Sequence, residues 1–317
     1  MSTGKNIVSC SVCQLALSFP IPYNYRYMKL FSLFTSQYYK PTWIYAVDSH
    51  LWRILFSHGD LVAGEHRDND KKQVTFFCID SRSGEEKWNI RKAEEGWWTT
   101  TEGVYGNKLY LHAFAKPDLP QPKHVTSIDM KNGSVLWDHP DLTFLYVKDD
   151  MVVVERKEFE ITRYHRLDTE TGKILDTIYD RHIIDDELSE ARANDPHTLL
   201  MFPDVYNPGL QDHELFTRIV SEKQTRERIL DPIEVMQFGD NLIVCYHRVK
   251  DERSEGSPVL VHELCIHNKA NLKEVYSDVL MDNASAPVPD GFFIRENVLY
   301  YIRNRNQLLA ITLRDTL

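Results

Sequence analysis

The feature that most constrains the fold is a repeated pair of apolar runs, the second of which often closes on a turn of the form Asp-x-x-Ser/Thr-Gly. Three turns carry this signature or a close variant, at residues 80–84, 129–133 and 168–172. The Asp side chain can accept backbone N–H bonds from the residues that follow it, and the Gly adopts a positive φ without a steric penalty. A hairpin turn that recurs in this way predicts antiparallel sheets built from one repeated unit.

The spacing of the copies predicts the number of units. Aligned on the first apolar residue after each turn, the copies begin at Leu61, Leu109, Met151, Leu242 and Val298. The intervals are 48, 42, 91 and 56 residues, so the third interval is close to two units and a degenerate copy is expected near 198–202. We therefore expect an all-β fold, a single β-propeller of four-stranded blades, with six blades favoured within a range of five to seven.

The two ends of the chain predict how such a ring is closed. The last copy stops after the apolar run 308–313, before it has an outer strand. Trp43 stands 18 positions ahead of the first copy, and Trp88 and Trp137 stand 21 and 14 positions ahead of the next ones. An N-terminal strand around Trp43 is therefore expected to complete the last blade, which pairs the exposed edges and closes the ring.

Two segments depart from the repeat. Residues 1–27 hold no complete export signal, so we expect a disordered N-terminal extension ahead of a propeller domain at 28–317. A short helix is expected at 180–195, with a surface loop as the alternative. Four apolar residues of this segment fall on one helix face: Ile183, Ile184, Leu188 and Ala191.

Composition limits the partners and the location. A formal charge of −10 and a pI near 5.7 disfavour contact with nucleic acid or an anionic membrane surface. The five cysteines have no framework spacing, which indicates reduced thiols. The apolar stretch at 7–20 is too short to cross a bilayer, which needs about 20 residues. We expect a cytoplasmic monomer without a membrane partner.

The sequence contains no recognisable catalytic string. Neither a Gly-x-Ser-x-Gly elbow nor a phosphate-binding loop occurs. Glu65 and His66 are adjacent, but neighbouring side chains of a strand point to opposite faces, so they are not expected to share a proton. The 13 histidines lack paired ligands at metal-site spacing, and Cys10-x-x-Cys13 has no second pair. We expect no catalytic residue, no cofactor and no metal.

Aromatic residues give the candidate binding site. Trp52, Trp97 and Trp98 precede the anchor residues of their copies by 9, 12 and 11 positions, near the start of the innermost strands. An aromatic rim at the mouth of the channel, with Arg53 and Glu65 nearby, is suited to hold a peptide or a small ligand. The alternative is that these rings only fill the space between sheets.

The string Asp-x-x-Ser/Thr-Gly-x-x-x-Trp, at 80–88 and in a variant with Asn132 at 129–137, resembles the tryptophan-docking motif of quinoprotein-like propellers with PQQ-like repeats. In size and in its opening, at 40–43 and 52–55, the chain is similar to an uncharacterised bacterial family of single propellers. The quinoprotein resemblance implies a quinone held under adjacent cysteines and a calcium ion. The sequence has no adjacent cysteines and no cluster of oxygen ligands that suits calcium.

These observations favour a non-catalytic propeller that serves as a binding or scaffolding module for a protein or a small ligand. The alternative is an enzyme, a hydrolase or an oxidoreductase, with a site assembled from several blades at the central channel. Three or more His, Asp or Glu side chains within about 4 Å of one another around one pocket would favour that alternative.

Overall fold

The computed structural model describes residues 38–92, 96–116, 119–159, 161–193, 195–207, 209–251 and 258–314. The extension expected at 1–27 lies outside these ranges. The described chain divides into two compact units. The first unit comprises residues 41–202 and 292–312, and the second comprises 38–40, 203–291 and 313–314. Within the described ranges, every helix is too short or too polar to cross a bilayer.

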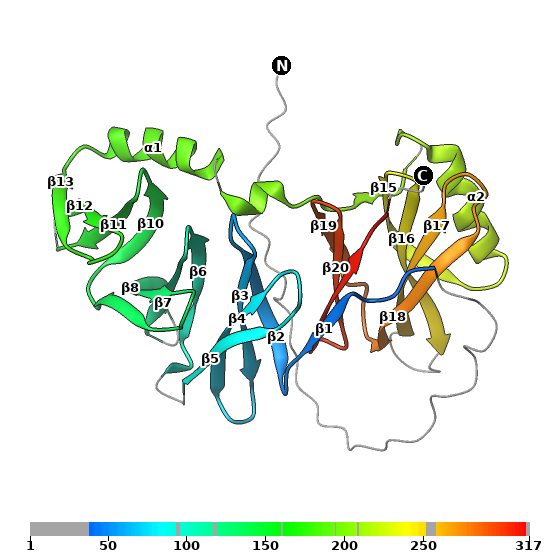
Figure 1. Cartoon of the computed structure of the whole chain (residues 1–317), viewed down its shortest axis with the longest axis horizontal. Coiled ribbons are helices and arrows are strands. Elements are labelled where there is room, and N and C mark those ends of the chain that lie inside the picture. Colours follow the sequence, from blue (N-terminus) through cyan, green and yellow to red (C-terminus); the bar gives the residue numbers. More distant parts are fainter. Residues whose placement is uncertain are drawn as a thin grey trace. The chain divides into compact units, whose positions relative to one another are not determined.

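The first unit holds four sheets of four strands, in which neighbouring strands are antiparallel (Figure 1). Three of them are simple meanders in chain order. They are β2 (His50–Phe56), β3 (Leu61–Asp68), β4 (Gln73–Asp80) and β5 (Glu86–Lys92); β6 (Thr99–Tyr105), β7 (Lys108–Lys116), β8 (Leu119–Asp129) and β9 (Val135–His139); and β10 (Thr143–Lys148), β11 (Met151–Lys157), β12 (Thr162–Asp168) and β13 (Ile174–Ile178).

The fourth sheet of this unit joins the two ends of the repeat region. Its strand order is β1 (Trp43–Ala46), β21 (Gln307–Thr312), β20 (Val298–Arg303) and β19 (Phe292–Arg295). Trp43 pairs with Ala310 in the antiparallel register, and β1 lies beside β21 at the edge of the sheet. The prediction that an N-terminal strand completes the last blade is confirmed.

The second unit contains one sheet of five strands and a helix. The strand order is β14 (Asp204–Val205), β15 (Ile229–Phe238), β16 (Asn241–Asp251), β17 (Val259–Asn268) and β18 (Glu274–Ala284). Helix α2 (His213–Gln224) buries Phe216, Ile219 and Val220 in one cluster with apolar residues of β15, β16 and β17. The four long strands of this sheet repeat the meander of the first unit.

Tryptophans of the outer strands bind the turns of the following sheets. Trp88 of β5 donates its indole N–H to the carbonyl oxygen of Met130 at 2.7 Å, and its ring covers Gly133. The same contact recurs twice, from Trp43 to Ser81 at 2.9 Å and from Trp137 to Thr169 at 2.9 Å. These contacts and the strand order define propeller-type blades, as predicted.

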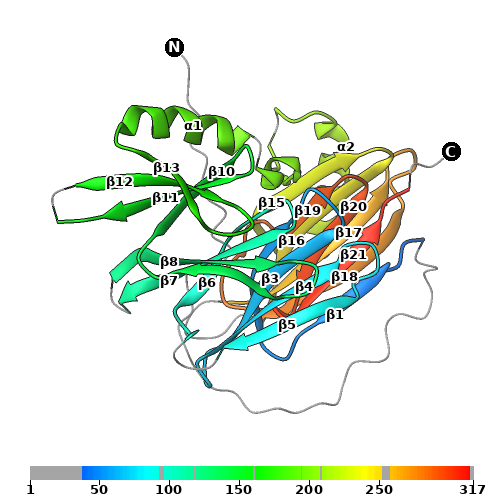
Figure 2. The ribbon, with the colours of Figure 1, turned by 60° about the vertical axis from the view of Figure 1, so that its left-hand side comes forward.

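The expected helix is present as α1 (Arg181–Ala193), which lies against the sheet of β10 to β13 (Figure 2). Ile184 and Ala191 are buried there, whereas Ile183 is exposed. The degenerate copy expected near 198–202 is not a sheet, because Pro196–Leu199 forms the 3₁₀ helix η2 and Met201 makes only an isolated bridge to Ile294. The N–H groups of Thr198 and Leu200 donate locally, to the carbonyl oxygens of Asp195 and His197, and so do not enter a strand ladder. The described residues therefore form five sheets.

Candidate functional site

Three of the five predicted binding residues, Trp52, Trp97 and Glu65, meet around Arg67, a side chain that sequence analysis did not single out. Among the contacts of the described residues, none places Trp98 or Arg53 at this guanidinium. Arg67 lies on β3, between Trp52 of β2 and Trp97, which precedes β6. Its guanidinium carbon is 5.6 Å from the ring centre of Trp52 and 5.1 Å from that of Trp97. A guanidinium at these distances is attracted to both indole faces.

Each of the three guanidinium nitrogens of Arg67 donates a hydrogen bond within the protein. Nε donates to Glu65 Oε1 at 3.0 Å, Nη1 donates to the carbonyl of Trp97 at 2.8 Å, and Nη2 donates to the carbonyl of Thr99 at 2.6 Å. Arg67 is therefore fixed in place, and it fixes the backbone that carries Trp97.

Glu65 acts as the anchor of this group. Its carboxylate is fully buried and also accepts bonds from Thr100 Oγ1 and the Thr101 N–H, both at 2.8 Å. His66, the next residue, is hydrogen-bonded to Ser49 at 2.5 Å, and burial lowers the pKa of this imidazole. Glu65 and His66 thus serve different faces of β3, as expected from strand geometry. Glu65 positions the site and does not face solvent.

The outer part of the group is aromatic. Trp98 is 40% exposed, and Trp52 and Trp97 are half-buried. The ammonium of Lys72 lies 5.1 Å from the ring centre of Trp97. Arg53 donates to the carbonyl of Thr101, so its guanidinium is partly engaged by the protein. We call Trp52, Trp97 and Trp98, which follows Trp97 in the chain, the aromatic rim; Arg67 contacts the first two of these rings.

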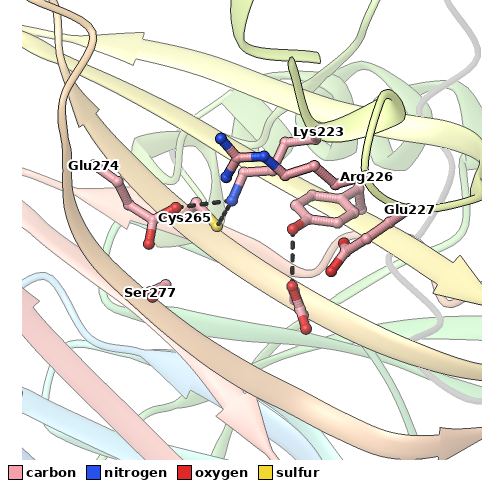
Figure 3. A pocket seen from close by; sticks show the side chains of 8 residues that line it. Lys223, Arg226, Glu227, Cys265, Glu274 and Ser277 are labelled. Carbon is pink, nitrogen blue, oxygen red and sulfur yellow. Dashed lines mark hydrogen bonds and ion pairs between the residues drawn. The ribbon is translucent and has the colours of Figure 1, made fainter. Parts of the chain in front are cut away.

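The second unit has a small polar pocket of about 160 Å³ (Figure 3). It lies between α2 and strands β16 to β18 and is lined by Lys223, Arg226, Glu227, Tyr246, Glu263, Cys265, Glu274 and Ser277. Lys223 Nζ is 2.7 Å from Glu274 Oε2 and 3.3 Å from Cys265 Sγ. Burial opposes the charge on Lys223, but the neighbouring Cys265 and Glu274 outweigh it and raise the pKa of this amine.

The other charges of this pocket are also paired. Tyr246 donates to Glu263 at 2.8 Å, and Arg248 Nε is 2.7 Å from the same carboxylate. Such pairing leaves a polar hollow in which opposite charges already neutralise one another.

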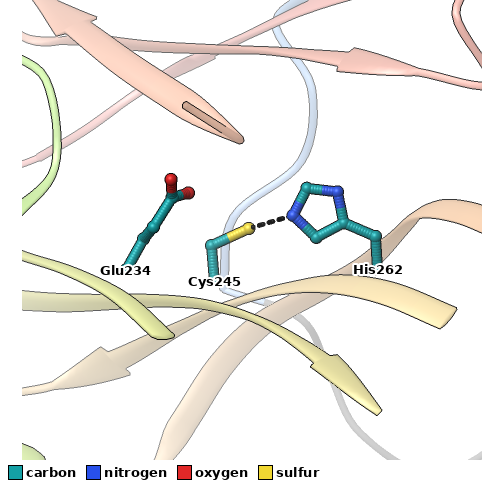
Figure 4. A group of neighbouring side chains, drawn as sticks. All are labelled: Glu234, Cys245 and His262. Atoms are coloured by element: carbon teal, nitrogen blue, oxygen red, sulfur yellow. Dashed lines mark hydrogen bonds between the residues drawn. The ribbon is translucent and has the colours of Figure 1, made fainter. Parts of the chain in front are cut away.

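Two groups of titratable side chains converge in the described part of the second unit. They are Glu234, Cys245 and His262 (Figure 4), and Cys265, His267 and Glu274. In each group the ligand-type atoms lie within 4.8 Å of one another. Burial raises the pKa of Glu234 and of Cys245 and lowers that of His262 to about 3. Each group joins one cysteine to two His or Glu side chains, whereas the enzyme alternative was expected to show three His, Asp or Glu side chains.

A family model described as "Domain of unknown function (DUF4905)" matches residues 57–137. The match spans β3 to β8 and part of β9, and it includes Arg67, Trp97 and two of the repeated turns. No curated protein sequence matches the chain.

Three solved structures illustrate the similarity to known proteins. The β-propeller domain of the trilobed protease from Pyrococcus furiosus is 10% identical, with a TM-score of 0.30 over 80% of this chain and 64% of that one. The acylaminoacyl peptidase from Pyrococcus horikoshii is 10% identical, with a TM-score of 0.27 over 80% and 36%. An uncharacterised protein from Listeria monocytogenes EGD-e is 9% identical, with a TM-score of 0.30 over 82% and 94%.

The chain spans less than two thirds of the first two of these proteins. Because TM-scores at this level carry no argument, the fold assignment rests on the strand order and the tryptophan contacts of the chain itself. Those features define an all-β protein of propeller-type blades. Over residues 57–137 it is similar to a family whose function is not known.

Proposed function

We propose that the chain is a non-catalytic binding module that holds an extended protein segment on the aromatic rim. The observation that supports this most is the rigid support of the rim. Arg67 is held by three hydrogen bonds and two ring contacts, and Glu65 anchors it from below. Rigid aromatic side chains lose little entropy on binding, and Trp and Arg are enriched among residues that dominate binding energy.

The chemistry of the rim suggests what the segment presents. Trp52 and Trp97 already have Arg67 and Lys72 at their rings, so the 40% exposed ring of Trp98 is the one that we expect the segment to contact. Indole faces attract aromatic, aliphatic and cationic side chains. The net charge of −10 favours a basic partner through long-range attraction. We therefore expect a peptide with an aromatic residue near lysine or arginine, bound in the cytoplasm by a monomer.

The test is a selection of random peptides displayed on phage against the full chain, followed by titration of the enriched peptides. Trp98→Ala removes the most exposed ring of the rim, and we expect it to weaken binding at least about 10-fold, as for a residue that dominates binding energy. Val135→Ala, at another exposed apolar side chain on β9, is the matched control and should leave affinity unchanged. A selection without enrichment, or equal affinities for wild type and Trp98→Ala, contradicts the proposal. Enrichment of a small molecule but no peptide in a parallel ligand screen also contradicts it.

A further inference from the structure

Three ligand-type side chains meet on one face of the five-stranded sheet. Glu234 of β15 and Cys245 of β16 are direct cross-strand partners, and His262 of β17 reaches the same place from the next strand. Cys245 Sγ is 3.0 Å from His262 Nε2, and all three ligand-type atoms lie within 4.8 Å of one another. Figure 4 shows the three side chains converging from their strands.

The three side chains are deeply buried, and the backbone of Gly291 lies close to them. Glu234, Cys245 and His262 are 6%, 1% and 3% exposed. Gly291 covers the group, and a Cβ at this position would lie 2.6 Å from Cys245 Sγ and 2.9 Å from His262 Nε2. Only a residue without a side chain fits there. A carboxyl, a thiol and an imidazole that are buried together must each find polar partners, and here the thiol and the imidazole face each other.

The covering segment also orients the carboxylate. The N–H groups of Asp290 and Gly291 donate to the two oxygens of Glu234, at 2.6 and 2.9 Å. Outer hydrogen bonds of this kind fix the direction of metal-binding carboxylates. His247 adds to the packing, because its ring stacks on His262 with 3.9 Å between centres and it accepts the Val288 N–H at 3.1 Å.

The neighbouring group of Cys265, His267 and Glu274 differs in one decisive respect. The ammonium of Lys223 already lies between its thiol and its carboxylate, at 3.3 and 2.7 Å. A cation from the protein thus takes the place that an ion would need. Glu234, Cys245 and His262 have no such amine among the hydrogen bonds and ion pairs of the described residues.

We propose that Glu234, Cys245 and His262 bind one zinc(II) ion. A carboxylate oxygen, a thiolate sulfur and an imidazole nitrogen form a mixed set that suits this borderline-soft cation. On binding, the thiol gives up its proton to solvent and the Cys245 to His262 hydrogen bond is replaced by two metal bonds. The ion would join β15, β16 and β17 beneath the segment that ends at Gly291.

The experiment titrates the full chain, freed of metal by a chelator, with zinc(II) against a chromogenic competitor and with cobalt(II) as a spectroscopic probe. A Cys10→Ser/Cys13→Ser background removes the paired thiols near the N-terminus. We expect one equivalent of zinc per chain, a thiolate-to-cobalt charge-transfer band, and a rise in melting temperature with zinc.

Variants separate this group from its neighbour. Cys245→Ala should abolish the charge-transfer band and weaken zinc binding more than about 100-fold, beyond what loss of an outer partner causes. Glu234→Gln keeps the side-chain shape and should weaken binding at least about 10-fold, which decides the matter if circular dichroism shows Cys245→Ala to be unfolded. Cys265→Ala is the matched control and should bind like wild type. Absence of stoichiometric binding, binding that survives both Cys245→Ala and Glu234→Gln, or binding lost in folded Cys265→Ala would overturn the proposal.

Discussion

At the scale of single residues, the contact between a tryptophan and a glycine turn determines how neighbouring sheets of the first unit pack. Gly133 has a φ of +77°, and a Cβ there would lie 2.9 Å from the ring of Trp88. The indole therefore rests directly on the backbone of the turn while its N–H bonds to Met130. Both the backbone conformation and the close approach require glycine.

Gly133→Ala should destabilise the protein by about 2–4 kcal/mol, because it adds a clash with Trp88 to the strain of a positive φ. Gly106→Ala is the control, since Gly106 has a φ of +59° and nothing within 4 Å of its would-be Cβ. The control should cost only the backbone part, about 1 kcal/mol. Urea unfolding measures both, and equal losses would show that the ring does not press on the turn.

Arg67 and Glu65 form a buried ion pair. Removing one partner lowers the free energy of unfolding, because the other is left buried without a compensating charge. Arg67→Met should lower the free energy of unfolding by about 3–5 kcal/mol, because the Glu65 carboxylate is left without its cation. Arg82→Met breaks the exposed pair with Asp60 at 2.7 Å and should cost less than about 1 kcal/mol. Similar losses in the two variants, measured by chemical denaturation, would mean that Arg67 does not stabilise Glu65.

At the scale of elements, helix α1 is an insertion that packs on a blade through one apolar face. Ile184 packs into a cluster with Tyr146, Val153 and Tyr164, whereas its neighbour Ile183 is 45% exposed. Ile184→Ala should cost about 2–4 kcal/mol through lost burial and a residual cavity. Ile183→Ala, the same chemical change one position earlier, should cost less than about 1 kcal/mol. If both variants melt at the same temperature, α1 is not held by this face.

The elements also show where sequence patterns suffice. The turn residues predicted the blades, and the position of Trp43 predicted that β1 completes the last one. Both features depend on local residue types and on spacing. The prediction of a sixth copy at residues 198–202 was wrong, because a short apolar run resembles a strand whereas two of its N–H groups bond within a local turn. Spacing alone does not distinguish an insertion from a degenerate repeat.

The candidate sites were harder to predict, for a physical reason. Arg67 joins Trp52 and Trp97 through contacts across two sheets, and no local string encodes such a meeting. Glu234, Cys245 and His262 come from three strands, separated by 11 and 17 positions. The sequence gives one hint of this group. Cys245 and His247 are two positions apart in an apolar run, so both side chains lie on one face of the strand. That Glu234 and His262 lie beside Cys245 follows only from the pairing register of the three strands.

At the scale of the whole molecule, the account depends on a sheet that joins residues 270 positions apart. Thr42 Oγ1, just before β1, and Thr312 Oγ1, at the end of β21, are 3.0 Å apart. The Trp43 indole then reaches Ser81 of the following sheet. Pairing of this kind protects two sheet edges and ties down both ends of the blade region.

The most direct measurement is a disulfide between these two positions. In a background without the native cysteines, Thr42→Cys/Thr312→Cys should form an intramolecular bond under mild oxidation, because the two side chains already touch. Peptide mass spectrometry should recover the linked fragments from folded monomer, and the bond should raise the melting temperature, since it closes a loop of about 270 residues. Thr42→Cys/Val135→Cys, which pairs β1 with an exposed site on β9, should stay reduced. A folded monomer in which both pairs stay reduced, or both cross-link equally, would contradict the shared sheet.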